Sequence, residues 1–244
     1  MQLHVVTPGT LSQQDIIHIS SLIHPHVTAI HIREKSWTQQ HIRQTVQQML
    51  LRGIPASKIM VNNHPELVVE LGIKGVHMPE FAPMPTYNNS SDRSDRVLSV
   101  GALSAGPNEP SSMIIGRSVH SAQRAVEAEQ EGCHYAIFGH IYATNSKLGM
   151  EPRGIEELAQ VCSALHIPVI AIGGIQPQHI AELRSAGVAG IAVMSSIFTA
   201  HSPLESVQQY VAAIQHIGTV QAELIQPPVS FDTHTSGGSD IHAK

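Results

Sequence analysis

The sequence predicts an α/β protein that folds as a single (β/α)8 TIM barrel. Short apolar runs alternate with amphipathic helical patterns, which indicates parallel strands joined by right-handed crossover helices. Eight such runs fit within roughly 215 residues, as this barrel requires. Runs such as IPVIAI (167–172) are apolar on both faces, which is typical of a buried parallel sheet. An open doubly wound sheet is disfavoured, because VVTPGTLS (5–12) lacks the glycine-rich fingerprint expected after its first strand.

Each predicted strand is defined by an apolar run and by the pattern that follows it. Strands are expected at 3–7, 27–34, 58–62, 74–78, 113–119, 134–139, 167–174 and 189–195. Seven of them precede a stretch in which apolar side chains recur at helical spacing. These helices are expected at 12–23, 38–53, 65–72, 121–132, 154–165, 176–187 and 203–217. Gly53 is a suitable end for the second helix, since glycine readily takes the left-handed conformation that ends many helices.

Two segments depart from this repeat. Residues 79–112 are rich in Pro, Ser, Asn and Gly and show no helical pattern. We expect a long loop at the active-site face there, with a short strand at RVLSV (96–100) and the length to act as a lid. Residues 218–244 are polar and are expected to form a flexible C-terminal tail outside the barrel domain, which spans 1–217.

Composition excludes several classes of function. The formal net charge of -5, the pI of 6.4 and the 4% aromatic content argue against a nucleic-acid partner. Because no run reaches about 18 apolar residues and the start has no signal-peptide pattern, we expect no membrane partner and a cytoplasmic location. Cys133 and Cys162 lack metal-ligand spacing and are expected to be reduced thiols.

Polar and small residues collect where the predicted strands end. In this fold the chemistry lies at the carboxyl ends of the strands. The candidate binding residues at these ends are Arg33, Lys35, Asn62, Ser118, Thr144, Lys147, Gly173, Gly174, Met194 and Ser195. The two lysines and the arginine would hold an anionic ligand. The glycines, with a short helix beginning near Ser195, would form a phosphate cradle; the alternative is that they merely permit a tight turn.

His120 is the candidate catalytic residue. It stands at the end of the fifth strand, two residues from the polar Ser118, and an imidazole exchanges protons near neutral pH. The alternatives are that His120 caps the helix starting at Ser121 or binds phosphate. His140 is a competitor, unless it only shapes the following loop. Carboxylates are scarce at the strand ends, where Glu34 and Glu80 are the main ones, so we expect no metal and no other cofactor.

Six ordered motifs across residues 1–217 resemble the thiamine phosphate synthase/TenI family. They are HIREK (31–35), VNNHPELVVELGIKGVHM (61–78), GRSVHS (116–121), FGHIYATNSKLGMEPRG (138–154), IPVIAIGGI (167–175) and AGIAVMSSIF (189–198). Synthases of this family carry aspartates after the third and fourth strands that bind the Mg²⁺ of a pyrimidine pyrophosphate. Asn63 and Ala82 stand in those positions here, which removes the charge that offsets such a metal.

The resemblance is therefore closest to TenI-type thiazole tautomerases, which similarly lack these acids. It implies an isomerase of thiamine biosynthesis that converts a non-aromatic thiazole carboxylate phosphate to its aromatic tautomer. His120 would be its acid/base. Arg33, Lys35 and Lys147 would lie at the ligand mouth, and the backbone around Gly173, Gly174, Met194 and Ser195 would hold the phosphate of this small phosphorylated thiazole. A synthase and a non-catalytic regulatory barrel remain alternatives, and the oligomeric state, a homo-oligomer included, is left open.

Overall fold

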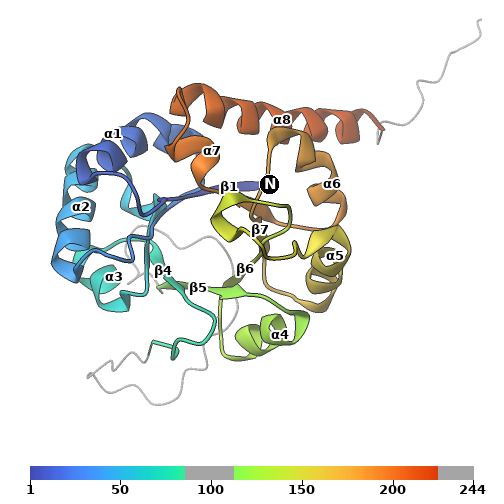
Figure 1. The fold of residues 1–244 in the computed structure, drawn as a ribbon, viewed down its shortest axis with the longest axis horizontal. Helices are drawn as coiled ribbons and strands as arrows, with labels where there is room; N and C mark the ends of the chain where they lie inside the picture. The colour runs from blue at the N-terminus through green and yellow to red at the C-terminus, as the bar shows by residue number, and fades with distance from the viewer. Residues whose placement is uncertain (86–112, 225–244) are drawn as a thin grey trace, which may run out of the picture.

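Eight parallel strands close into a barrel in which each strand pairs with its neighbours in chain order (Figure 1). The computed structural model describes residues 1–85 and 113–224. Its strands are β1 (Gln2–Val6), β2 (Ala29–Ile32), β3 (Ile59–Asn62), β4 (Gly75–Met78), β5 (Ile114–Val119), β6 (Tyr135–Gly139), β7 (Val169–Ile172) and β8 (Gly190–Val193). Pairing of β1 with β8, from Gln2↔Gly190 to Val5↔Val193, closes the barrel. The predicted (β/α)8 fold is confirmed.

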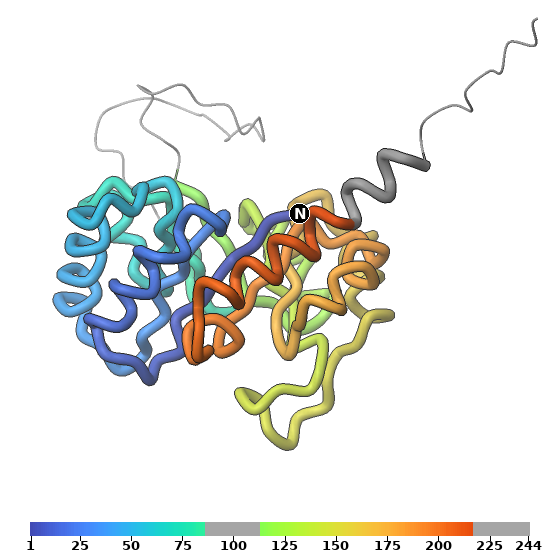
Figure 2. The backbone as a smooth tube through the Cα atoms, turned by 90° about the horizontal axis from the view of Figure 1, so that it is seen from above, coloured from blue at the N-terminus to red at the C-terminus, as the bar shows by residue number. Residues whose placement is uncertain are grey.

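Helices surround the strands as an outer ring (Figure 1). They are α1 (Gln13–Ile23), α2 (Gln39–Leu51), α3 (Pro65–Leu71), α4 (Ala122–Gln130), α5 (Gly154–Ala164), α6 (Ile180–Ser185), α7 (Ser195–Phe198) and α8 (Pro203–Leu224), with 3-10 turns η1 (His24–His26), η2 (Ala56–Lys58), η3 (Asn145–Lys147) and η4 (Pro177–His179). The side chains of Ser12, Thr38 and Ser121 cap α1, α2 and α4 by accepting backbone N–H groups. Helix α8 packs between α1 and α6 and completes the ring (Figure 2).

The structure corrects one boundary and leaves two predictions outside its described part. Helix α8 continues to Leu224, so residues 218–224 are helical rather than part of a flexible tail. No proline interrupts that stretch before Pro227, and residues such as Gln221, Ala222 and Glu223 are good helix formers. The predicted strand at 96–100, the lid and the tail at 225–244 lie outside the described residues. Within 79–85 no helix or strand forms, as expected for a loop.

The side chains of each strand alternate between two apolar layers. Those that point outward pack against the helices, and those that point inward fill the barrel. The inner layer contains Val6, Ala29, Met60, Ile137, Ile170 and Ala192. No helix among the described residues is long and apolar enough to cross a membrane. Cys133 and Cys162 are free thiols, of which Cys133 is buried.

Three buried histidines and a tyrosine interrupt the apolar interior. His4, His31, His77 and Tyr135, here called the interior cluster, are each at most 6% exposed, and their rings contact one another. His4 Nε2 lies 2.9 Å from Gln2 Oε1, which can only accept, and His4 Nδ1 lies 3.0 Å from His31 Nε2. His4 therefore donates to Gln2 and accepts from His31, and this leaves Nδ1 of His31 buried without a partner among the described residues.

Burial keeps the interior cluster neutral. It lowers the pKa of His4 to about 4 and that of His31 well below the ordinary value, with contributions from the neighbouring histidines. Burial, followed by the charges of His4, Arg33 and Arg117, lowers the pKa of His77 to about 3. Burial also raises the pKa of Tyr135. The interior cluster thus consists of uncharged hydrogen-bonding groups at neutral pH.

Candidate active site

His120 lies at the carboxyl end of β5 and is bound by Glu80, which follows β4. Its Nδ1 lies 2.8 Å from Glu80 Oε2, and its backbone N–H donates to Glu80 Oε1 at 3.0 Å. The side chain of His120 is 39% exposed, whereas that of Glu80 is only 13% exposed. No described residue bonds Nε2 of His120. The structure therefore holds one edge of the imidazole against a carboxylate and leaves the other nitrogen without a partner from the described part of the chain.

The partner of His120 differs from the one that the sequence suggests. Ser118 lies in β5 and His120 directly follows that strand, but no hydrogen bond joins their side chains. Ser118 Oγ instead lies 2.8 Å from His77 Nε2 and joins the interior cluster to the strand ends. The alternative that His120 caps the next helix is wrong, because Ser121 Oγ accepts the N–H of Arg124 and caps α4.

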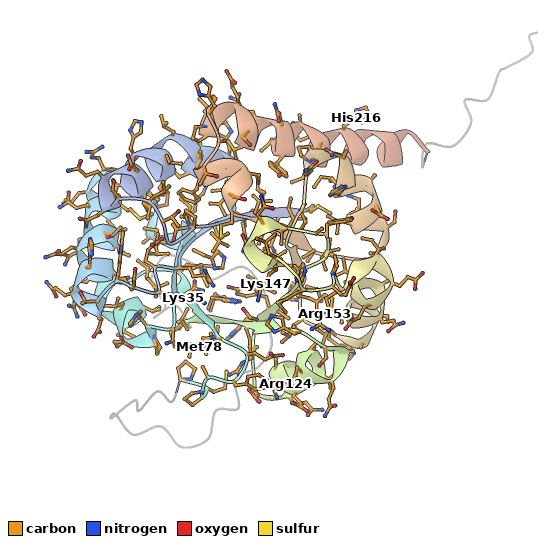
Figure 3. The ribbon with its side chains drawn as sticks, viewed as in Figure 1. Lys35, Met78, Arg124, Lys147, Arg153 and His216 are labelled. Carbon is orange, nitrogen blue, oxygen red and sulfur yellow. The ribbon has the colours of Figure 1, made fainter. Side chains whose placement is uncertain are left out.

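Three cations at the same end of the barrel have no acidic partner among the described residues. Arg33, Lys35 and Lys147 form no ion pair within the described ranges, whereas Arg43, Arg117, Arg124 and Arg153 each do. In the view of Figure 3, Lys35 and Lys147 fall within the outline of the helix ring, and Arg124 lies on α4 at its edge. Arg33 follows the inward-facing His31 by two residues, and its charge helps to lower the pKa of His77. The mouth is thus positively charged.

The end of β3 presents amides instead of carboxylates. Asn62 ends the strand with a buried side-chain oxygen that has no partner among the described residues. Asn63 takes a left-handed conformation with φ of 61°, and its N–H donates to the His77 carbonyl at 3.0 Å. Ala82 packs against the apolar core. Within the described ranges, no three His, Cys, Asp or Glu side chains come together as metal ligands do.

Glu34, the other carboxylate considered from the sequence, is only 3% exposed and supports the loop after β1. Its Oε1 accepts the N–H of Gly9 at 3.2 Å, and its Oε2 is buried without a partner in the described part of the chain. Glu34 therefore supports a loop, and Glu80 binds His120, so the two carboxylates have separate structural roles.

Gly173 and Gly174 have a structural role that requires no ligand. Both have positive φ, at 100° and 66°, and a Cβ at either would collide with the loop after β6, from His140 to Ala143. Helix α7 begins at Ser195, after Met194, so the predicted short helix beyond β8 is present. The glycines explain how the loops after β6 and β7 pack together, and their contact with phosphate stays a prediction.

The loop after β6 carries Thr144 and Lys147 and projects at one end of the barrel, drawn in yellow-green in Figure 2. Thr144 accepts the N–H of Ser146 and begins η3, which ends with the exposed Lys147. His140 is 6% exposed, and its Nε2 lies 3.3 Å from the Met150 carbonyl. This contact fits the alternative in which His140 shapes the loop.

Sequence reasoning missed the pairing of Glu80 with His120 and the interior cluster. The sequence shows Glu80 only as an isolated carboxylate near a strand end, because its partner is 40 residues away in the chain. The interior cluster does leave a signal, since QLHVV, AIHI and GVHM place each histidine on one face of a strand. That signal indicates a buried imidazole and assigns no chemistry to it.

Together, the fold and this site define a (β/α)8 barrel whose mouth combines an imidazole–carboxylate pair with unpaired cations. The family model described as "Thiamine monophosphate synthase" (TMP-TENI) matches residues 3–197. The chain belongs to this family of thiamine-biosynthesis enzymes, as its sequence motifs indicate.

Named relatives are similar over different shares of their length. A "Thiamine-phosphate synthase" of Chlorobium luteolum is 46% identical over 100 residues, which cover 41% of this chain and 47% of the relative, less than half its length. A "Putative thiamine-phosphate synthase" of Geobacter sulfurreducens is 30% identical over 190 residues, covering 77% of this chain and 81% of the relative. The solved "Thiamine phosphate pyrophosphorylase" of Pyrococcus furiosus has a TM-score of 0.64 at 22% identity and covers 88% of this chain and 96% of that one, which supports the fold.

Proposed function

We propose that this protein is a thiazole tautomerase, which converts the non-aromatic thiazole carboxylate phosphate to its aromatic tautomer. One observation carries the proposal: His120 is bound through Nδ1 to Glu80, and Nε2 is open at the cationic mouth of the barrel. This arrangement suits a proton transfer on an anionic substrate. The lack of aspartates at Asn63 and Ala82 supports the same choice.

The reaction moves one proton and requires no change in oxidation state. Nε2 of His120 removes the proton from ring C2 and becomes positively charged with Nδ1 still bound to Glu80. The electron pair moves through the ring toward the exocyclic carbon, which then takes the proton back from Nε2. Arg33 and Lys35 stabilise the negative charge that builds toward the substrate carboxylate. The backbone near Gly173 and Ser195 holds the phosphate.

A thiamine phosphate synthase is the second candidate, and the names of the relatives favour it. Such an enzyme joins a thiazole phosphate to a pyrimidine pyrophosphate bound through Mg²⁺. Magnesium prefers carboxylate oxygens together with phosphates. At the mouth, the two family positions hold Asn63 and Ala82, and Glu80 is engaged by His120. These residues fit a metal-bound pyrophosphate poorly.

A pair of assays on the purified full chain distinguishes the candidates. The non-aromatic thiazole carboxylate phosphate is followed by ultraviolet absorbance and proton NMR in EDTA, and pyrophosphate release from the two synthase substrates is followed with Mg²⁺. We expect rapid aromatisation in EDTA and no pyrophosphate release. Mg²⁺-dependent pyrophosphate release without aromatisation would establish the synthase instead. Ligand binding with neither activity would indicate a regulatory barrel.

The unpaired cations are expected to determine substrate affinity. Lys35→Ala and Lys147→Ala should each raise KM about 10-fold, because each removes about 1.4 kcal/mol of charge-assisted binding. Lys147→Ala should leave kcat nearly unchanged, whereas Lys35→Ala should also lower kcat, because Lys35 stabilises charge that builds in the transition state. The increase in KM should be smaller at high salt, since these side chains are exposed and salt screens their charges. Lys74→Ala is the matched control, because the exposed Lys74 precedes β4 at the opposite end of the barrel. An equal change in KM for all three variants would contradict this assignment.

A further inference from the structure

We propose that Glu80 is the positioning residue for His120. It fixes the imidazole as the Nδ1–H tautomer, so that Nε2 is the base, and it stabilises the imidazolium formed when Nε2 takes a proton. This inference rests on the proposed function for its kinetic consequence. Its structural consequence, the tautomer of His120, is measurable without any substrate.

The carboxylate of Glu80 is matched to two donors on one residue. Oε1 accepts the backbone N–H of His120 at 3.0 Å, and Oε2 lies 2.8 Å from Nδ1 of the same residue. An ionised carboxylate can only accept hydrogen bonds, so Nδ1 must carry the proton that lies between it and Oε2. A neutral imidazole has a single N–H, and Nε2 is therefore left with a lone pair.

Glu80 is itself anchored through its backbone. Its carbonyl oxygen accepts from Arg117 Nη1 at 2.8 Å and from Arg124 Nη2 at 2.9 Å. Arg117 is 1% exposed on β5, and its guanidinium also lies 3.3 Å from Glu131. These arginines come from the strand and the helix on either side of His120. The segment that carries Glu80 is thereby tied to the strand that carries His120, so the carboxylate is held in place before substrate binds.

Limited exposure makes this contact effective. With its side chain only 13% exposed, Glu80 is poorly hydrated, and its charge acts on the imidazole through a medium of lower polarity than water. A carboxylate placed this way orients the ring and offsets the positive charge that appears during proton transfer. Neither Arg33 nor the lysines can serve this purpose, because their charges oppose an imidazolium.

Glu80→Gln provides a sharp structural test, because the amide has one acceptor and one donor in place of two acceptors. If its oxygen keeps the backbone N–H of His120, its NH₂ group faces Nδ1, which must then accept. The imidazole would then be the Nε2–H tautomer, and Nε2 would have no lone pair to act as the base. We expect ¹H–¹⁵N correlation spectra at pH 9, where a free imidazole is neutral, to show Nδ1–H in the wild type and Nε2–H in the variant. The signal missing from His120→Asn assigns His120 among the 17 histidines.

The kinetic test follows the same variants in the tautomerisation assay. Glu80→Gln should lower kcat about 30-fold and change KM less than 3-fold, because Glu80 acts on the proton carrier and not on the substrate. Glu80→Asp keeps the charge and should recover part of the rate. Glu66→Gln is the matched control: Glu66 Oε1 lies 3.1 Å from His64 Nδ1, in a similar pair outside the proposed mechanism. It should leave kcat and the His120 tautomer unchanged.

The two readouts separate failure of the inference from failure of the proposed function. An active wild type with a fully active Glu80→Gln, or a wild-type His120 in the Nε2–H form, overturns the role of Glu80. A wild type without tautomerase activity overturns the proposed function alone, and the spectra then decide whether Glu80 sets the tautomer. A folded Glu80→Gln that loses kcat and switches tautomer together supports the inference. The anchoring of Glu80 through its carbonyl makes a folded variant the expected case.

Discussion

His120→Asn is expected to lower the kcat for thiazole aromatisation at least 100-fold, the loss typical when a positioned acid/base is removed. Asparagine is polar and of similar length, but it cannot exchange a proton near neutral pH. Because the cations at the mouth are untouched, the Kd for the aromatic product should change less than 3-fold. The result is measured as kcat by ultraviolet absorbance and as Kd by calorimetry.

His64→Asn is the matched control for this prediction. His64 also follows a barrel strand and also contacts a carboxylate, that of Glu66, yet it lies at the start of α3 and outside the proposed site. It should keep the full kcat. Equal turnover by wild type and His120→Asn, with both proteins folded, would remove His120 from the mechanism.

Acid is expected to destabilise the fold steeply, because the interior cluster must stay uncharged. In the unfolded chain a histidine takes up a proton near pH 6.5, whereas in the fold burial lowers the pKa of His4 to about 4 and of His77 to about 3. Between these values the unfolded state binds more protons. The stabilisation is therefore complete above pH 6.5 and is lost as the pH falls toward 4.

The size of this effect follows from the number of histidines that titrate together. With three of them, the free energy of unfolding should fall by up to about 4 kcal/mol per pH unit. Urea unfolding at pH 7.5 and pH 5 should differ by on the order of 5 kcal/mol, which is much of the stability of an ordinary domain. The measurement is the free energy of unfolding as a function of pH, followed by circular dichroism.

His31→Gln identifies the source of the pH dependence. The variant should lower by about a third the slope of the free energy of unfolding against pH, since it removes one titrating group from the unfolded chain. This holds whatever the variant does to the stability at pH 7.5. His18→Gln is the control, because His18 is exposed on α1 and its environment changes little on unfolding. An unchanged slope in His31→Gln would show that the acid sensitivity has another origin.

The barrel could be predicted because its repeat is local. Runs such as VIAI are apolar on both faces only where helices cover one face and the barrel interior the other, and side chains such as Ser121 mark where helices begin. The family motifs are likewise continuous in sequence. The sequence pattern places the end of α8 too early, because the polar composition after residue 217 is typical of a tail although the residues favour a helix.

The site was only partly predictable. The strand ends place Arg33, Lys35 and His120 at the same end of the barrel, since all strands run in parallel. The hydrogen bonds between side chains there depend on differences of a few ångströms in the positions of segments that are far apart in the chain. The structure therefore pairs His120 with Glu80 and Ser118 with His77, where sequence spacing had favoured Ser118 and His120.

By itself, the sequence determined the alternating strands and helices of the barrel, the family, and the lack of aspartates at residues 63 and 82, because each of these follows from short continuous segments of the chain. The tertiary structure alone decided which cations lack an acidic partner in the described ranges, that Gly173 and Gly174 make room for the neighbouring loop, and which carboxylate binds the imidazole. The physical reason is that hydrogen bonds and desolvation depend on distance and burial in space. Periodicity in the chain fixes the direction in which a side chain points and not the group that it meets.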